Sequence, residues 1–397
     1  MFRRLQDLQS SDADWRAGRS ALHVYWAGED VQRISAQAYT MFQQSNALAP
    51  RAFPGLQQME QEIIAMSLPL WQAPVGAGAA VTSGGTESII LAMQAIRHRA
   101  REQRPALARP VVLAGRSAHP AWEKAAGLLG MHIHRVPLGS DFCMDPGAVA
   151  GAVTGDVAGI VGSAPSLPFG TVDPIPALGA LAQKYDLWLH VDACLGGYLA
   201  PFVRAQGHAV PEYDLSVPGV RSLSADLHKY GYAPKGNALI AYRDAEDLAR
   251  NRFYFDNWPK GGYETRTLAG TRSGGALAAA WAVMTNLGEK GYKERAGQIM
   301  QTRARIEAGL RDIGGFELMG KQPLGVLSFM SPGRDAFISE DRLGRLGWYT
   351  SRTAHPVGLQ MTLTPIHARS TDRFLEDLER VVHAQADSSK EVAISTY

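Results

Sequence analysis

Residues 224–236 read Ser-Ala-Asp-Leu-His-Lys-Tyr-Gly-Tyr-Ala-Pro-Lys-Gly, a motif with a lysine at its centre. The motif begins within a short predicted strand at residues 222–225, and the lysine follows that strand. Lys229 stands between His228 and an aromatic segment that contains glycine. Burial and neighbouring cations lower the pKa of a lysine, and the neutral amine is the nucleophile that forms a Schiff base. The alternative is a solvated loop lysine, which the apolar and aromatic surroundings disfavour.

On both sides of this motif, short apolar runs alternate with amphipathic stretches. Strands are predicted at residues 79–82, 111–114, 133–137, 157–163, 188–191 and 222–225. Helices are predicted at residues 86–101, 119–129 and 176–185. This alternation is typical of an α/β fold with a mainly parallel sheet covered by helices. Residues 238–242 are predicted as an antiparallel addition to that sheet.

The chain is predicted to have three parts: an N-terminal segment (residues 1–77), a large domain (78–290) and a smaller C-terminal α+β domain (291–397). Residues 1–50 are expected to be polar and irregular apart from a helix at 29–44, and a second helix is predicted at 55–68. A helix at 275–287 leads out of the large domain. The smaller domain is predicted to hold helices at 292–313, 341–346 and 371–386, and strands at 316–319, 325–330 and 358–363. The polar tail after Asp387 is expected to fray.

Composition excludes several classes of function. The chain has 397 residues, of which 46% are hydrophobic, and this is enough for more than one domain. Lys plus Arg (40) nearly balance Asp plus Glu (38), so there is no electrostatic case for nucleic-acid binding. No stretch approaches the ~20 apolar residues of a spanning helix, and no secretory signal is evident. Cys143 and Cys194 lack metal-ligand spacing, and a reduced cytoplasmic protein is favoured over a disulfide.

Two further motifs suit the binding of a charged small molecule. Thr82-Ser83-Gly84-Gly85-Thr86-Glu87-Ser88 follows a predicted strand and opens a predicted helix, so its backbone N–H groups could cradle a phosphate. An ordinary strand–helix turn with Thr86 as the N-cap is an equal alternative. His190-Val191-Asp192-Ala193-Cys194-Leu195-Gly196-Gly197 places an acid at a strand's carboxyl end, where ligands of open α/β sheets bind. That acid could pair with a protonated ring nitrogen, or backbone N–H groups could satisfy it.

A fourth motif, Ala269-Gly270-Thr271-Arg272-Ser273-Gly274-Gly275, precedes the predicted helix at 275–287. It could bind a second anion or reach a neighbouring active site, or it could be a helix-capping loop.

Taken in this order, the four motifs resemble the group II pyridoxal-5'-phosphate (PLP)-dependent decarboxylase superfamily, and most closely its sphingosine-1-phosphate lyase branch. Ser45-Asn46 with Phe53-Pro54-Gly55, Ser117-Ala118-His119 and residues 363–369 (Leu-Thr-Pro-Ile-His-Ala-Arg) resemble that branch too. The similarity covers roughly residues 18–382. It implies PLP as cofactor, a lyase reaction and fold type I, the aspartate aminotransferase-like architecture.

The resemblance also implies roles for single residues. Lys229 would hold PLP as a Schiff base, Asp192 would pair with the pyridine nitrogen, and His119 would stack on the ring, although spacing alone favours a core histidine. The cofactor phosphate would be held by Gly84, Gly85, Thr86, Ser224 and His228, with Ser273 and Gly274 added by the partner subunit of a homodimer whose active sites lie at its interface. The amine substrate would meet Tyr25, Asn46 and Lys235. No metal is implied.

The chain departs from the branch on the substrate side. Ala49 stands where the branch has a histidine, and Leu167 and Phe169 replace an aromatic residue and a second histidine. Losing a charged hydrogen bond to an anion costs on the order of 1.5–3 kcal/mol, so these departures disfavour a phosphorylated substrate. Three hypotheses follow: a lyase that cleaves a β-hydroxy amine by a retro-aldol reaction, an amino-acid decarboxylase, and a catalytically silent relative. Intact Lys229 and Asp192 disfavour the last.

Overall fold

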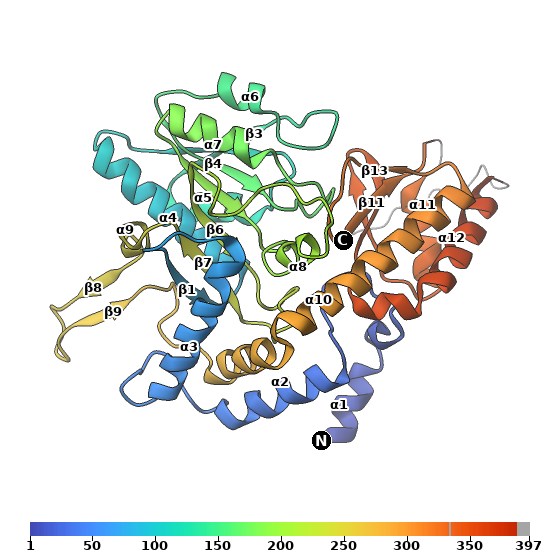
Figure 1. Cartoon of the computed structure of the whole chain (residues 1–397), viewed down its shortest axis with the longest axis horizontal. Coiled ribbons are helices and arrows are strands. Elements are labelled where there is room, and N and C mark those ends of the chain that lie inside the picture. The colour runs from blue at the N-terminus through green and yellow to red at the C-terminus, as the bar shows by residue number, and fades with distance from the viewer. Residues whose placement is uncertain (333–334, 387–397) are drawn as a thin grey trace. The chain divides into compact units, whose positions relative to one another are not determined.

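The computed structural model describes residues 1–332 and 335–386 (Figure 1). The chain forms two compact units. The larger unit consists of residues 29–293 with 320–324, and the smaller unit consists of residues 1–28, 294–319 and the chain from 325 onward. The three-part division expected from the sequence stays a prediction.

A seven-stranded sheet forms the centre of the larger unit. Its order is β1 (Gly78–Thr82), β7 (Ala238–Tyr242), β6 (Val220–Ala225), β5 (Trp188–Asp192), β4 (Val157–Ser163), β2 (Val111–Gly115) and β3 (His132–Val136). Neighbours from β6 to β3 pair in parallel, whereas β7 is antiparallel to both β1 and β6. The predicted α/β sheet and the antiparallel addition at 238–242 are therefore confirmed. The carboxyl ends of β1, β2, β4, β5 and β6 meet at one edge, where ligands bind in such sheets.

Helices cover both faces of this sheet. On one face lie α4 (Gly85–Gln103) and α5 (Ala121–Leu129), whose Ile96 and Trp122 belong to one buried cluster with Val112 and Val161 of the strands. On the other face lies α7 (Ile175–Lys184), which approaches so closely that a Cβ atom on Gly162 would be 2.4 Å from Ile175. Strands buried on both faces read as continuous apolar runs, and this explains why the sequence revealed them.

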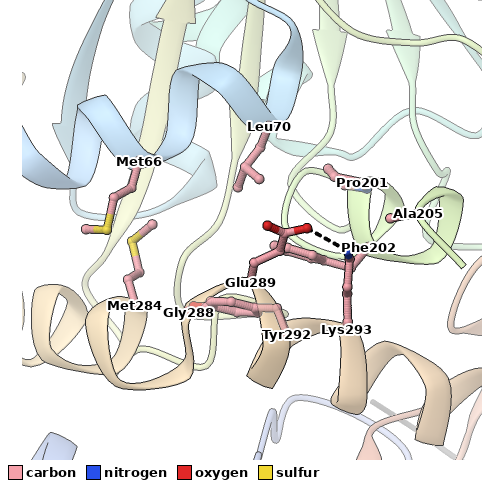
Figure 2. A pocket seen from close by; sticks show the side chains of 10 residues that line it. All are labelled: Met66, Leu70, Pro201, Phe202, Ala205, Met284, Gly288, Glu289, Tyr292 and Lys293. Carbon is pink, nitrogen blue, oxygen red and sulfur yellow. Dashed lines mark ion pairs between the residues drawn. The ribbon is translucent and has the colours of Figure 1, made fainter.

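The longest helix, α10 (Gly274–Ile313), is interrupted at Gly288, where φ is 52° and ψ is −172°. The two helices predicted on either side of residue 288 are therefore confirmed as two segments. The segment up to Lys293 belongs to the larger unit, together with α2 (Glu29–Phe42), α3 (Pro54–Ser67), η2 (Leu68–Trp71), α6 (Pro146–Gly151) and α8 (Ala200–Arg204). Figure 2 shows that Tyr292, just after the break, lies against Phe202 of α8.

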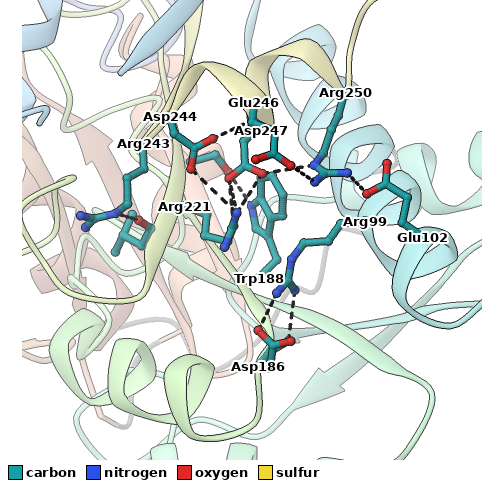
Figure 3. Close-up of polar contacts among 12 residues, drawn as sticks. Arg99, Glu102, Asp186, Trp188, Arg221, Arg243, Asp244, Glu246, Asp247 and Arg250 are labelled. Carbon is teal, nitrogen blue, oxygen red and sulfur yellow. Dashed lines mark hydrogen bonds and ion pairs between the residues drawn. The ribbon is translucent and has the colours of Figure 1, made fainter. Parts of the chain in front are cut away.

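A network of charged side chains connects α9 (Ala245–Ala249) to the sheet at the edge opposite the carboxyl ends of the parallel strands (Figure 3). Arg221, at the start of β6, donates from Nε and Nη2 to Asp247, both at 2.9 Å. Arg250 Nε lies 3.2 Å from the same carboxylate, which is fully buried. Arg243, just after β7, donates to the carbonyls of residues 215, 217 and 220. These contacts fix the strand ends that lie farthest from Lys229.

The smaller unit holds an antiparallel sheet in the order β10 (Glu317–Leu318), β11 (Val326–Met330), β13 (Val357–Thr362) and β12 (Ser351–Ala354). Its other elements are η1 (Trp15–Ala17), α11 (Ala336–Arg345), η3 (Pro365–Arg369) and α12 (Thr371–Ala386). Residues 18–21 join this sheet: Thr362 N donates to the Ala21 carbonyl at 2.7 Å, and His367 Nε2 lies 2.9 Å from the Ser20 carbonyl. The chain's beginning is thus packed against its last elements.

Some sequence predictions were wrong or incomplete. Residues 10–28 and 43–50 are mostly turns and irregular structure, as expected, but the helices α1 (Phe2–Gln9) and η1 (Trp15–Ala17) were not predicted. None of the residues of α1 is buried. Helix α11 begins five residues earlier than predicted, at Ala336, where the Asp335 side chain caps it by accepting the N–H of Phe337. The hairpin of β8 (Phe253–Phe255) and β9 (Tyr263–Thr265) was not predicted. The tail after Asp387 lies outside the described residues.

None of the helices in the described part of the chain has the length and apolar character that a membrane span requires.

Candidate active site

Lys229 lies in the loop that follows β6, at the carboxyl edge of the sheet. Its Nζ is 3.1 Å from Oδ2 of Asp226, and Nε2 of His228 is 3.5 Å from the same oxygen. The Lys229 carbonyl accepts the N–H of Tyr232, which has a φ of +59°. A bulky residue in this left-handed region is uncommon, and such strain concentrates at functional sites. The loop therefore holds the lysine in a sharp turn over a buried carboxylate.

Asp192 ends β5 and faces Ser224 of β6 in register. Its Oδ1 accepts the Cys194 N–H at 3.2 Å, and its Oδ2 accepts the Trp122 indole N–H at 3.3 Å. Burial raises the pKa of Asp192, but the Lys229 ammonium and a hydrogen bond from the Cys194 side chain outweigh this effect, so the pKa lies below its usual range. Asp192 is therefore an ionised carboxylate at the place predicted for it.

His119 lies in the loop between β2 and α5, the third strand end to reach this edge. Its Nδ1 accepts the Ala121 N–H at 3.1 Å, which leaves the proton of the neutral ring on Nε2. Loss of solvation lowers the pKa of His119, and the Lys229 charge adds to this, while Asp192 opposes it. The structure thus brings His119, Asp192 and Lys229 within one electrostatic neighbourhood.

The turn between β1 and α4 forms a cradle beside them. Gly84, with a φ of +156°, is the N-cap of α4, so the alternative with Thr86 as N-cap is wrong. No side chain of the described residues caps this helix N-terminus. A Cβ atom on Gly85 would lie 2.8 Å from Cys194 Sγ and 3.0 Å from each Asp226 carboxylate oxygen. The first amides of an uncapped helix are donors for an anion. Glycine is required at position 85 because a side chain there would collide with Cys194 and Asp226.

Ser224 is fully buried inside a hydrogen-bonded chain of side chains. Its Oγ lies 3.1 Å from Nε2 of His190, whose Nδ1 is 2.7 Å from Ser222 Oγ. Burial lowers the pKa of His190 to about 4, so this histidine is neutral. The predicted contact of Ser224 with a cofactor phosphate stays a prediction, since the structure shows its Oγ joined to His190.

Lys235 lies at the other side of the Lys229 loop. Its Nζ donates to the His228 carbonyl at 3.1 Å. Burial and the charge of Lys229 lower the pKa of Lys235, whereas Asp226 raises it. The charges of Lys229 and Lys235 therefore act on each other, and an anionic ligand between them would be favoured.

Asn46, Ser273 and Gly274 form a separate group whose members bind one another. Asn46 and Ser273 pair as an isolated antiparallel bridge, and Gly274 N donates to the Ser45 carbonyl at 2.9 Å. Ser273 Oγ accepts the Ala276 N–H at 3.2 Å, as a helix cap does. The predicted place of Ser273 and Gly274 in a partner's site stays a prediction. Tyr25 belongs to the smaller unit, and its substrate role also stays a prediction.

Sequence reasoning missed three residues of this site. The Asp226 Oδ2 contacts both His228 and Lys229. Its Oδ1 is buried and has no hydrogen-bond partner in the described part of the chain. Glu87 shapes the cradle by accepting the Ser83 N–H at 2.7 Å and the Leu268 N–H at 2.8 Å. Glu87 lies in the glycine-rich motif and Asp226 in the lysine motif, so an acidic residue inside each motif could have been recognised as part of the site. Trp122 lies in no motif and could not have been recognised in this way.

These residues fit PLP by their chemistry. They provide an amine for its aldehyde, an ionised carboxylate for its ring nitrogen, and a glycine cradle at a helix N-terminus for its phosphate. Among the described residues the buried Asp226 Oδ1 has no hydrogen-bond partner, which agrees with a polar group bound beside it.

Residues 17–331 match the family model of the pyridoxal-dependent decarboxylase conserved domain. The chain belongs to this family. It is 37% identical to a sphingosine-1-phosphate lyase of Oryza sativa over 94% of this chain and 71% of that protein. It is 32% identical to a probable L-tyrosine/L-aspartate decarboxylase of Methanothermobacter thermautotrophicus over 88% of this chain and 94% of that protein.

Among solved structures, a sphingosine-1-phosphate lyase from Burkholderia pseudomallei superposes with a TM-score of 0.92 at 37% identity, covering 97% of this chain and 92% of that one. The family member described here is therefore a PLP-dependent lyase of fold type I, as the sequence motifs implied.

Proposed function

We propose that this protein is a carbon–carbon lyase that cleaves a phosphorylated β-hydroxy amine, of the sphingoid-base type, into an aldehyde and a phosphorylated amine. In this retro-aldol reaction the Cα–Cβ bond breaks, the β-hydroxyl loses its proton, Cβ becomes the aldehyde carbon and Cα gains a proton. The observation that carries the proposal is the 37% identity to sphingosine-1-phosphate lyases over nearly the whole chain.

When bound, PLP supplies the electron sink that accepts the electron pair of the broken bond. The residues of the chain have separate tasks around it. Lys229 would hold the cofactor, and its amine would move a proton at Cα of the substrate. Asp192 would hold the proton on the ring nitrogen, because its own low pKa keeps it ionised. His119, neutral and with its Nε2–H available, would cover the ring face.

The loop after Lys229 would select the substrate's charged end. Lys235 is held by the His228 carbonyl close to Lys229, and an ammonium there would pair with a substrate phosphate. Thr86 and the α4 N-terminus would hold the cofactor phosphate, with His228 beside them. The substrate phosphate and the cofactor phosphate would then lie on two sides of the Lys229 loop.

The proposal includes a homodimer with active sites at its interface, in which Ser273 and Gly274 serve the partner's cofactor. It also includes a cytoplasmic location, supported by Cys143 and Cys194, which are both free thiols.

One observation favours a second function, an amino-acid decarboxylase. Phe169 is 6% exposed and packs on Phe142 with ring centroids 5.0 Å apart, so this position offers packing where the lyase branch has a histidine. Leu167 is 37% exposed and apolar. Phe169 and Ala49 stand where the lyase branch has histidines, so two donors for a substrate phosphate are lost. The similarity to the Methanothermobacter protein agrees with this alternative.

One experiment separates the two functions. Holoenzyme is incubated with a phosphorylated sphingoid base and, separately, with a panel of α-amino acids, and products are identified by mass. The proposal expects a fatty aldehyde from the first incubation; carbon dioxide from an amino acid, with no aldehyde, supports the alternative. Lys229→Ala is the control and should abolish product in either case.

A further inference from the structure

An apolar pocket lies in the larger unit, away from the cradle, between α3, α8 and α10 (Figure 2). Its volume is about 290 Å³, close to the lower end of small-molecule sites. Met66 and Leu70 come from one side, Phe202 from α8, and Met284 and Tyr292 from α10. The walls are therefore hydrocarbon, thioether and aromatic surfaces, which accept a flexible apolar chain.

The mouth of the pocket carries one acid and one base. Glu289 and Lys293 line it and pair with each other at 2.5 Å. Their side chains are 73% and 38% exposed. An exposed pair on one helix contributes little stability, so it opens at small cost to a ligand that satisfies both charges. An apolar pocket with this mouth suits an amphiphile whose head carries both a cation and an anion.

The pocket exists because α10 breaks. At Gly288 the backbone leaves the helical conformation, with φ 52° and ψ −172°, and both Gly288 and the following turn line the cavity. A continuous helix would carry Glu289 and Tyr292 in a different direction.

The floor of the pocket is joined to the Lys229 loop. Tyr292 is stacked between Phe202, at 4.9 Å and 10°, and Tyr232, at 6.1 Å and 19° between ring planes. The Tyr292 hydroxyl donates to the Gly231 carbonyl at 2.9 Å. Tyr232, in its left-handed conformation, donates in turn to the Lys229 carbonyl at 2.9 Å. A ligand that moves Phe202 or Tyr292 therefore moves the turn that carries Lys229.

We propose that this pocket is a second ligand site, for a single-chain amphiphile with a zwitterionic head, and that its occupancy is transmitted through Tyr292 to Lys229. The apolar chain lies between Met66, Met284 and Phe202, the anionic part of the head meets Lys293, and the cationic part meets Glu289. This site is distinct from the cofactor site, and the proposal holds whichever reaction the enzyme catalyses.

The probe is decylphosphocholine, kept below its micelle-forming concentration and titrated calorimetrically into the holoenzyme. We expect saturable binding with one site per chain. Met66→Trp fills the pocket from its rim and should weaken binding by about tenfold or more, since the chain loses its buried surface. Leu70→Trp tests the same space if Met66→Trp does not fold. Leu128→Trp, on the exposed face of α5, is the matched control and should bind as the wild type does.

Two variants test the head group and the transmission. Lys293→Gln should weaken binding of the probe severalfold, while Tyr292→Phe keeps the ring and should bind nearly normally. In the wild type the probe should shift the pH midpoint of the visible absorbance of the bound cofactor, and Tyr292→Phe should lose this shift. Absence of saturable binding, or unchanged binding in both tryptophan variants, overturns the site. A shift that survives in Tyr292→Phe overturns the transmission.

Discussion

The charge states around Lys229 depend on which neighbours each buried group has. Burial lowers the pKa of both His119 and His228, while acids raise it again: chiefly Asp192 for the first and Asp226 for the second. Asp192 is held ionised by Lys229 and Cys194. A carboxylate beside each histidine thus opposes part of the pKa lowering that burial causes, with Asp226 the main acid at His228 and a weaker influence at His119.

Asp226→Asn tests this at His228. Burial lowers the pKa of His228 and the Asp226 charge opposes that, so removing the charge should lower this pKa further. The protonated histidine attracts the cofactor phosphate, and this contribution disappears as pH rises through its pKa. PLP affinity measured by absorbance titration from acid to alkaline pH should therefore weaken at lower pH in the variant. His228→Gln, the control, should lack this transition, and an unchanged midpoint in Asp226→Asn would contradict the assignment.

His190→Gln tests the buried chain beneath Ser224. The folded pKa of His190, about 4, lies below its ordinary value of 6.5, so the unfolded chain binds more protons between these pH values. This histidine's contribution to stability is therefore complete above pH 6.5 and is lost as pH falls toward 4. From pH 7.5 to pH 5 the wild type should lose about 2 kcal/mol of unfolding free energy relative to His190→Gln.

Denaturant unfolding of both proteins at the two pH values measures this difference. Burial raises the pKa of Asp173 from 3.8 to about 6, and this acts in the opposite direction to His190. The contribution of Asp173 to the unfolding free energy falls as pH rises from 3.8 to 6. Asp173 is present in both proteins, so its effect cancels in the difference. Parallel stability curves would refute the burial of a neutral His190.

At the scale of elements, the cradle between β1 and α4 depends on close approach. A Cβ atom on Gly85 would meet Cys194 Sγ at 2.8 Å and Asp226 at 3.0 Å, so the loop after β5 and the Lys229 loop would have to move apart. Gly85→Ala should therefore cost about 1–3 kcal/mol of unfolding free energy and weaken PLP binding. Gly127→Ala, in α5, is the matched control, because a Cβ atom added there would meet no atom within 4 Å. This variant should leave the unfolding free energy unchanged or raise it by up to about 1 kcal/mol. Calorimetric melting with and without PLP measures both, and equal behaviour would contradict the close packing.

The elements differ in how well the sequence predicted them, and burial explains the difference. The strands Val157–Ser163 and Ala238–Tyr242 were predicted to the residue, because every residue in them is buried and turn residues bound them. The hairpin strand Phe253–Phe255 is exposed throughout, so it has no alternation to reveal it. In the candidate site, Lys229 and Asp192 stood out as candidates because each lies in a motif of the sequence. Trp122 did not, because it meets Asp192 only when α5 packs over β5.

At the scale of the molecule, the larger unit has its chemistry at one edge of the sheet and a charged network at the other (Figure 3). Asp247 is the centre of that network: it is fully buried and accepts from both Arg221 and Arg250. Arg221 lies over the Trp188 ring at 5.1 Å, so the network touches β5 as well as β6. Both strands carry site residues at their other ends.

Asp247→Ala should therefore destabilise the larger unit by about 3–5 kcal/mol, because it leaves two guanidinium groups without their buried partner. Denaturant unfolding measures this loss. Glu246→Ala is the matched control: Glu246 pairs with the same Arg250 at 3.0 Å but is 83% exposed, so its removal should cost no more than about 1 kcal/mol. Because Asp247 lies at the edge opposite the cradle, the folded variant should bind PLP with wild-type affinity at low temperature. A large loss of affinity without a loss of stability would mean that this edge takes part in the site.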